Sequence, residues 1–132
     1  MMKKTTLINS QISAVIAKMG HFDTLTIGDA GLPIPQGPER IDLALMKGIP
    51  AFLDVLTAVL AELEVQRVFI ASEMRQKNAS LYEQITRIFD NIDIVEVPHE
   101  AFKTLTKSSN AVVRTGECLP YANIILESGV TF

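Results

Sequence analysis

The sequence predicts an α/β fold in which helices cover both faces of a mainly parallel sheet. Amphipathic stretches with an apolar residue every three or four positions alternate along the chain with short runs rich in valine and isoleucine. The length, 132 residues, suits one domain with one core. We therefore expect a single domain over residues 1–132, built as a three-layer α/β/α sandwich.

The first expected element is a helix. Apolar side chains recur at helical spacing from Ile12 to Met19. Asn9 or Ser10 can cap its start, and Gly20 lies where a left-handed residue often follows a helix. The helix therefore ends just before the polar segment that begins at His21.

A short strand over 25–28 follows and leads into a segment of different composition. Residues 28–50 contain four of the seven glycines and four of the six prolines, which indicates an extended, structured loop. A domain linker here would leave about 27 residues before it, too few for a domain. Within the loop, 40–45 (RIDLAL) predicts a short strand.

The second half continues the alternation. Pro50 fits the first position of a helix running to about 64, and Asn78 can cap a helix over about 79–89. A short helix is expected from His99 to about 107, and strands over 67–71, 92–97, 111–115 and 123–126. The last two strands are close enough in sequence to form an antiparallel hairpin, which would make the sheet mixed.

Composition and charge exclude several classes of protein. Apolar residues make up 48% of the chain, which excludes a disordered protein. The net charge is −3 and no run of Lys or Arg exceeds two residues, so we expect no nucleic-acid partner. No stretch approaches the roughly 20 apolar residues of a membrane span. A single cysteine, Cys118, favours a cytoplasmic protein.

Three ionisable residues lie at the boundaries of expected elements. His21 follows a helix, His99 begins one, and Asp29 follows the first strand between small residues. Ligands in open α/β sheets bind beyond the carboxyl ends of strands, so these positions favour a polar site. The alternatives are two surface histidines and an aspartate that caps a turn.

The segment 114–123 (RTGECLPYAN) is polar although apolar strands flank it. Tyr121 supplies a hydroxyl and a ring face, and Asn123 supplies donors and an acceptor. Sugar hydroxyls need mixed donors and acceptors, and an aromatic face covers sugar C–H surface, so this segment suits a polyol. A tight turn is the alternative interpretation.

Other chemistries have weaker support. Gly28-Asp29-Ala30-Gly31 does not have the spacing of a dinucleotide fingerprint, and no P-loop is present. His21, Asp29 and His99 have no close pair at helical or hairpin spacing, so we expect no metal. Cys118 has no neighbour that favours a thiolate, so we expect a buried or inert thiol rather than the nucleophile of a hydrolase.

Several motifs together resemble the D-ribose pyranase family, which has a sister branch acting on L-fucose. These are His21 after Met19-Gly20, the block GDAGLPIP at 28–35, the strand RIDL at 40–43, HEAFK at 99–103, and RTGE with PYANIIL at 114–126. The resemblance covers nearly the whole chain. It matches least between about 78 and 96.

The resemblance implies an isomerase that interconverts the pyranose and furanose forms of D-ribose without a cofactor, supplying ribose for phosphorylation. It implies that His21 is the catalytic acid and that Asp29, His99, Tyr121, Ala122 and Asn123 bind the sugar. It also implies a homo-oligomer of two stacked pentamers with sites at subunit interfaces.

The implied chemistry suits these residue types. Ring opening needs a proton on the ring oxygen and removal of the anomeric hydroxyl proton, and a histidine titrates close to neutrality. The base stays open among water, Asp29, His99 and Tyr121. An L-fucose mutarotase and a non-catalytic sugar-binding accessory protein of ribose uptake are the alternative functions.

Overall fold

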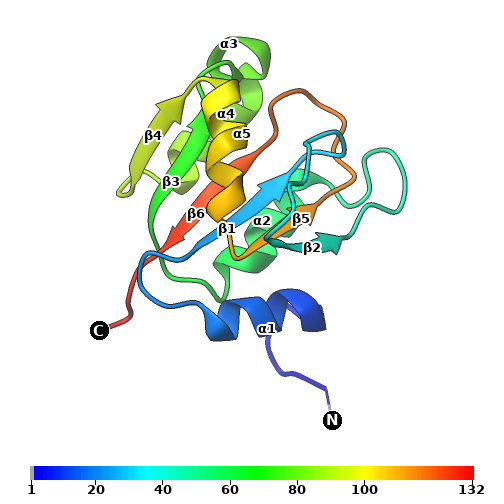
Figure 1. The fold of residues 1–132 in the computed structure, drawn as a ribbon, viewed down its shortest axis with the longest axis vertical. Helices are drawn as coiled ribbons and strands as arrows, with labels where there is room; N and C mark the ends of the chain where they lie inside the picture. The colour runs from blue at the N-terminus through cyan, green and yellow to red at the C-terminus, as the bar shows by residue number, and fades with distance from the viewer. Residues whose placement is uncertain (1) are drawn as a thin grey trace.

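Six strands form one mixed sheet in the order β2-β5-β1-β6-β3-β4 in a computed structural model that describes residues 2–132 (Figure 1). The strands are β1 (Thr24–Gly28), β2 (Glu39–Asp42), β3 (Val65–Ala71), β4 (Asp93–Val97), β5 (Ala111–Arg114) and β6 (Ile124–Ser128). The helices are α1 (Ser10–Lys18), α2 (Phe52–Leu60), α3 (Met74–Lys77), α4 (Ala79–Ile88) and α5 (His99–Leu105), followed by a 3-10 turn, η1 (Thr106–Ser108).

The sheet is mixed because of strand β6 alone. β1 pairs in parallel with β5, β5 with β2, and β3 with β4, whereas β6 runs antiparallel to both β1 and β3. The prediction of a mixed sheet is confirmed. The predicted hairpin between the last two strands is wrong, because β1 and β2 occupy both edges of β5 and β6 lies on the far side of β1.

Apolar side chains alternate between the two faces of the sheet, as the pleat requires. Leu25 and Ile27 of β1 join the larger core, which α1, α2 and α4 cover. Val112 of β5 and Ile125 of β6 point to the opposite face and pack against Phe102 of α5. The predicted three-layer α/β/α sandwich is therefore confirmed, with α5 crossing one face of the sheet in Figure 1.

The helix ends differ from the sequence predictions in detail. The Asn9 side chain accepts a hydrogen bond from the backbone N–H of Ile12, which confirms the predicted cap. The left-handed residue after α1 is Phe22, with φ of 74°, and Gly20 is not left-handed as predicted. In this turn the N–H of Gly20 donates a hydrogen bond to the Asp23 carboxylate over 2.8 Å, and the left-handed residue comes two positions later.

Two predictions for the middle helices are also wrong. Pro50 precedes the N-cap Ala51 and is not within α2, which ends at Leu60 rather than near 64. Asn78 occupies the N-cap position of α4, but its side chain donates to the carbonyl of Pro120 instead of capping the helix. No helix within residues 2–132 is long and apolar enough to cross a membrane.

Candidate active site at the ends of strand β1

Asp29 follows β1 directly and is held by a turn. Its backbone N–H donates to Oδ1 of Asn123 over 2.8 Å, and its carboxylate Oδ1 accepts from the N–H of Gly31 over 3.0 Å. Asn123 stands just before β6 and is only 1% exposed. A buried amide oxygen therefore fixes the backbone at the point where the chain leaves the sheet, and this fixes the direction of the Asp29 side chain.

Gly28 is required at the last position of β1. A Cβ there would lie 2.6 Å from Cδ2 of Leu32 and 3.2 Å from Oδ1 of Asn123. The carbonyl of Gly28 also accepts a hydrogen bond from the buried hydroxyl of Thr115 over 2.8 Å. The close approach of these groups leaves no room for a side chain, so the turn that presents Asp29 depends on glycine.

His99 lies beside this turn, at the start of α5. Its backbone N–H donates to both carboxylate oxygens of Glu73, over 3.0 and 3.2 Å. The imidazole meets the ring of Tyr121 edge-on, with centroids 5.1 Å apart. The Nδ1 atom of His99 is buried and has no hydrogen-bond partner within residues 2–132. Buried polar atoms are almost always paired, so this nitrogen indicates a place for a polar ligand.

Tyr121 has an unusual backbone conformation for a residue of its size, with φ of 56°. Its carbonyl accepts from the N–H of Asn123 over 2.9 Å, and the preceding carbonyl of Pro120 accepts from the Asn78 side chain. Ala122, between Tyr121 and Asn123, is fully buried. Left-handed non-glycine residues cluster at functional sites, and here the conformation turns the Tyr121 ring toward His99.

The carboxylate of Asp29 is the electrostatically perturbed group of this cluster. Burial raises the pKa of Asp29 above its ordinary value, while the hydrogen bond from Gly31 and the nearby His99 oppose the rise. A carboxylate with a raised pKa holds a proton more tightly than an exposed one does. Asp29 is thereby better suited to accept a proton near neutral pH.

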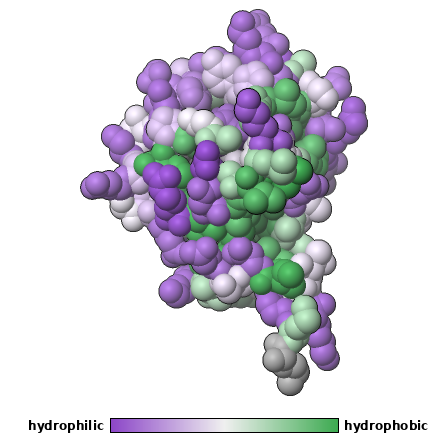
Figure 2. Space-filling view, turned by 90° about the vertical axis from the view of Figure 1, so that its right-hand side faces the viewer, coloured by the Kyte–Doolittle hydropathy of each residue, from purple (hydrophilic) through white to green (hydrophobic). Residues whose placement is uncertain are grey.

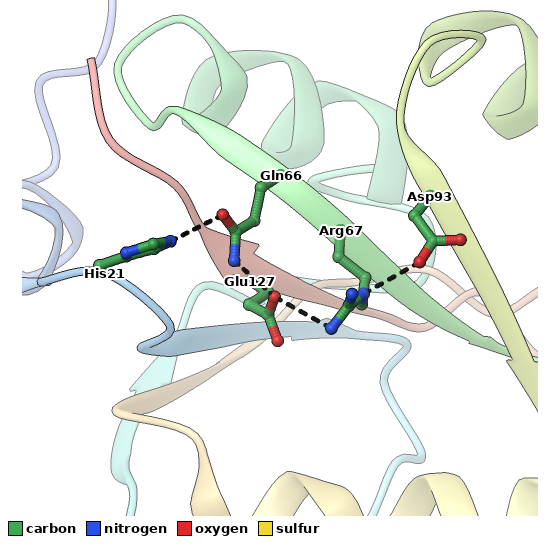
Figure 3. Close-up of polar contacts among 5 residues, drawn as sticks. All are labelled: His21, Gln66, Arg67, Asp93 and Glu127. Carbon is green, nitrogen blue, oxygen red and sulfur yellow. Dashed lines mark hydrogen bonds and ion pairs between the residues drawn. The ribbon is translucent and has the colours of Figure 1, made fainter. Parts of the chain in front are cut away.

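His21 does not lie with these residues. It precedes β1, whereas Asp29 follows it, and five strand residues at about 3.3 Å each separate the two by roughly 16 Å. The imidazole is exposed, and its Nε2 lies 2.8 Å from Oε1 of Gln66 (Figure 3). It lines an open hollow of about 440 Å³ together with Glu62 and Glu64.

Of the predicted site residues, the structure thus brings five together and leaves one apart. The carboxyl-end cluster comprises Asp29, His99, Tyr121, Ala122 and Asn123. His21 stands at the opposite end of the same strand. Within one chain, no residue of this cluster can exchange a proton directly with His21.

Sequence reasoning missed Glu73 and Gln66. Glu73 follows the carboxyl end of β3, the same signal that pointed to Asp29, so its contact with His99 was open to prediction. Gln66 lies within β3, and nothing in the sequence distinguishes it from other polar strand residues.

Cys118 is exposed rather than buried, and its thiol contacts the carbonyl of Gly116. Among residues 2–132, no three His, Cys, Asp or Glu side chains form a group able to hold a metal ion.

The chain matches known proteins over nearly its whole length. The RbsD / FucU transport protein family matches residues 2–131. A D-ribose pyranase of Coprothermobacter proteolyticus is 58% identical over 99% of this chain and 100% of its own length. A D-ribose pyranase of Pediococcus pentosaceus is 54% identical with the same coverage.

Solved structures share the fold. Bacillus subtilis RbsD complexed with D-ribose superposes with a TM-score of 0.96 and 43% identity, covering 99% of this chain and 100% of that one. The fucose mutarotase of Streptococcus pneumoniae in complex with L-fucose has a TM-score of 0.80 and 24% identity, covering 99% of this chain and 100% of that one. The second likeness extends to the fold alone.

Proposed function

This chain belongs to the RbsD / FucU family, and we propose that it acts as a D-ribose pyranase, an isomerase that exchanges the pyranose and furanose forms of ribose. The observation that carries this proposal is the 58% identity to a D-ribose pyranase over 99% of the chain. The matched region spans both ends of β1, so it covers the positions of the carboxyl-end cluster and of His21.

The carboxyl-end cluster is the proposed sugar site. The Asp29 carboxylate accepts hydrogen bonds from hydroxyls, and the unpaired Nδ1 of His99 supplies a further polar contact. The ring of Tyr121 offers an apolar surface for sugar C–H groups, and the backbone of Ala122 and Asn123 borders it. This mixture of acceptors, donors and an aromatic face matches the surface of a monosaccharide.

The proposed reaction moves only protons within the sugar and uses no cofactor. A protonated His21 gives a proton to the ring oxygen as the bond from C1 to that oxygen breaks. A base removes the proton of the C1 hydroxyl, and the electron pair of that O–H bond forms the C=O bond of the aldehyde. The C4 hydroxyl then attacks the aldehyde carbon and loses its proton, while the aldehyde oxygen gains one, so the five-membered ring closes and both groups recover their starting states.

We propose Asp29 as the base. Its raised pKa brings the carboxylate closer to the pH at which it works, and the turn at Gly28 aims it out of the sheet. His99 remains bound to Glu73 through its backbone and contacts Tyr121 through its ring, which suits a residue that orients the sugar. This division of roles leaves His21 as the acid.

The distance between His21 and Asp29 leads us to propose that neighbouring subunits share each site. His21 of one subunit would enter the sugar site of the next, and the family resemblance implies a decamer of two stacked pentamers. Exposed apolar side chains precede α2: Leu45, Met46 and Ile49 are 77%, 60% and 50% exposed. Leu45 and Met46 line one hollow with Ala30, the residue after Asp29. Figure 2 shows apolar surface gathered on this side of the molecule, where a second copy would cover it.

The proposed assembly and location can be tested separately from activity. Light scattering of the purified protein should give the mass of about ten chains, and a monomer at micromolar concentration would contradict the shared site. We also propose a cytoplasmic location, because the exposed thiol of Cys118 has no disulfide partner and suits a reducing compartment.

Saturation-transfer NMR on D-ribose tests the proposed activity. Irradiating an anomeric signal of the pyranose should reduce the furanose signals far more with the protein than in buffer, because the protein speeds their exchange. Binding of ribose without faster exchange would instead identify a sugar-binding accessory protein. Faster exchange of L-fucose than of ribose would identify a fucose mutarotase, whose solved relative shares only 24% identity with this chain.

A further inference from the structure

A row of polar side chains extends from His21 along the surface of the sheet (Figure 3). Nε2 of His21 lies 2.8 Å from Oε1 of Gln66, and Nε2 of Gln66 donates to Oε2 of Glu127 over 2.8 Å. These side chains come from the loop before β1, from the start of β3 and from the end of β6. The imidazole is therefore connected to the sheet through a single amide side chain.

The far end of the row fixes the orientation of that amide. The guanidinium of Arg67 contacts the same oxygen of Glu127 over 3.5 Å and donates to Asp93 over 3.0 Å. A carboxylate paired with arginine only accepts hydrogen bonds. The NH₂ group of Gln66 must therefore face Glu127, which leaves the amide oxygen facing His21.

An amide oxygen can only accept, so the nitrogen of His21 that faces Gln66 must carry a hydrogen. In the neutral imidazole this places the proton on Nε2 and leaves Nδ1 as the free acceptor. The hydrogen bond of the His21 side chain within residues 2–132 is the one from Nε2 to Gln66, and the side chain is exposed, so Nδ1 is open to a group from outside the chain. When the ring is protonated, the added proton is therefore the one on Nδ1.

The ring is also held from its face. Phe22 stacks on the imidazole with the ring centroids 3.8 Å apart and the planes 13° from parallel. Phe22 has φ of 74°, and its N–H donates to the carbonyl of Ser128 over 3.0 Å. A bulky residue in this conformation is strained, and the strain is offset here by contacts that orient the imidazole.

We propose that Gln66 is a positioning residue that holds His21 in the Nε2–H tautomer and leaves Nδ1 as the nitrogen that delivers the proton to the sugar. The proposal rests on the proposed function, because it assigns an atom to the proton transfer assigned above to His21. Glu127 acts through Gln66, and neither residue touches the sugar.

The tautomer can be measured directly. Magic-angle-spinning ¹⁵N NMR of the intact, ¹⁵N-histidine-labelled protein, at a pH where the imidazole is neutral, should show the proton of His21 on Nε2. The chain has two histidines, so comparison with His21→Ala assigns the signals. In Gln66→Met the two tautomers should become mixed. A proton on Nδ1 in the unmodified protein would overturn the proposal.

Kinetics provides the second test. Gln66→Met preserves the length of the side chain and removes both hydrogen bonds. By analogy with the loss of the hydrogen-bond partner of a metal-bound histidine, kcat for ribose exchange should fall on the order of tenfold to hundredfold. KM should stay unchanged. Gln84→Met, on the exposed surface of α4, is the matched control and should retain the unmodified rate.

A double exchange separates positioning from simple stability. Gln66→Glu alone puts two carboxylates side by side and should lose activity. With Glu127→Gln added, the new carboxylate at 66 accepts from His21 and from the new amide at 127, so most of the lost rate should return. No recovery, or equal rates for Gln66→Met and Gln84→Met, would overturn the role of Gln66. An unmodified protein without any exchange activity would instead overturn the proposed function.

Discussion

The two ends of strand β1 are built in different ways. At the carboxyl end, Asp29 and the buried Asn123 are held by backbone hydrogen bonds in a turn that has no room for a side chain at Gly28. At the amino end, His21 is exposed and is oriented by the side chains of Gln66 and Phe22. A half-buried turn is rigid within one chain, whereas an exposed imidazole held by its neighbours is placed to meet something outside the chain.

The difference suggests a division of labour between the two ends. In the proposed mechanism the carboxyl-end cluster binds and orients the sugar, and His21 supplies the proton from a neighbouring subunit. Changes at the amino end should therefore affect turnover while the fold is preserved. Changes at the carboxyl end should affect turnover and should also alter stability, upward or downward, because there the site residues are part of the folded core.

The largest effect is expected from His21→Ala at the amino end. Loss of the acid should lower the rate of ribose exchange by about 10²–10⁴-fold. The side chain is exposed, so the free energy of unfolding should change by less than about 0.5 kcal/mol. Saturation-transfer NMR and denaturant unfolding measure the two quantities. Exchange at the unmodified rate would remove His21 from the acid role.

Asp29→Asn should lower the rate by about 10²-fold or more, because the amide cannot act as a base. For the unmodified protein, the rate should fall as the pH drops through the raised pKa of Asp29, where the carboxylate becomes protonated. That acid limb should be missing from the residual activity of the variant. An unchanged pH profile in the variant would assign the base to another group.

Asp29→Asn should lower the rate but should not lower stability. Burial raises the pKa of Asp29, so the folded chain binds this proton more tightly than the unfolded chain does. The contribution of Asp29 to the free energy of unfolding is thus unfavourable above the raised pKa and improves as the pH falls through it. Asp29→Asn should therefore be at least as stable as the unmodified protein at pH 7. Urea unfolding measures this, and a clear loss of stability would contradict the burial of the charge.

The smallest effects are expected on the free energy of unfolding when one glycine at each end of β1 is replaced by alanine. Gly28→Ala places a methyl group 2.6 Å from Leu32 and should reduce the free energy of unfolding by about 1–3 kcal/mol. A Cβ on Gly20 would lie 3.9 Å from the Asp23 carboxylate, an ordinary contact, so Gly20→Ala should leave stability unchanged or raise it by less than about 1 kcal/mol. Equal losses in the free energy of unfolding would show that the chain is packed equally closely around both glycines, which would contradict the difference between the two ends.

Most of the fold could be predicted because the relevant signals are local. Short runs rich in valine and isoleucine predicted most of the strands, and Asp29 follows β1 at the end where ligands bind in open α/β sheets. Pairing across the sheet is not local: the insertion of β6 between β1 and β3 depends on contacts far apart in sequence, so the expected hairpin was wrong.

The site was predictable in part for the same reason. His21 precedes and Asp29 follows the same predicted strand, so their separation along β1 could be predicted from the sequence. The family resemblance implied that His21 and Asp29 act on the same sugar, but it did not show that they lie at opposite ends of β1. The role of Gln66 depends on the bulge between Val65 and Arg67 and on the neighbouring β6, and no spacing along the chain encodes either.

Subunit mixing tests most directly whether the two ends of β1 from different chains form one site. His21→Ala and Asp29→Asn should each be nearly inactive. Oligomers co-expressed from equal amounts of both should regain about a quarter of the unmodified activity, because a site then has a one-half chance of an intact His21 and a one-half chance of an intact Asp29 from its neighbour. Mixed oligomers with no more activity than either parent would contradict the shared site.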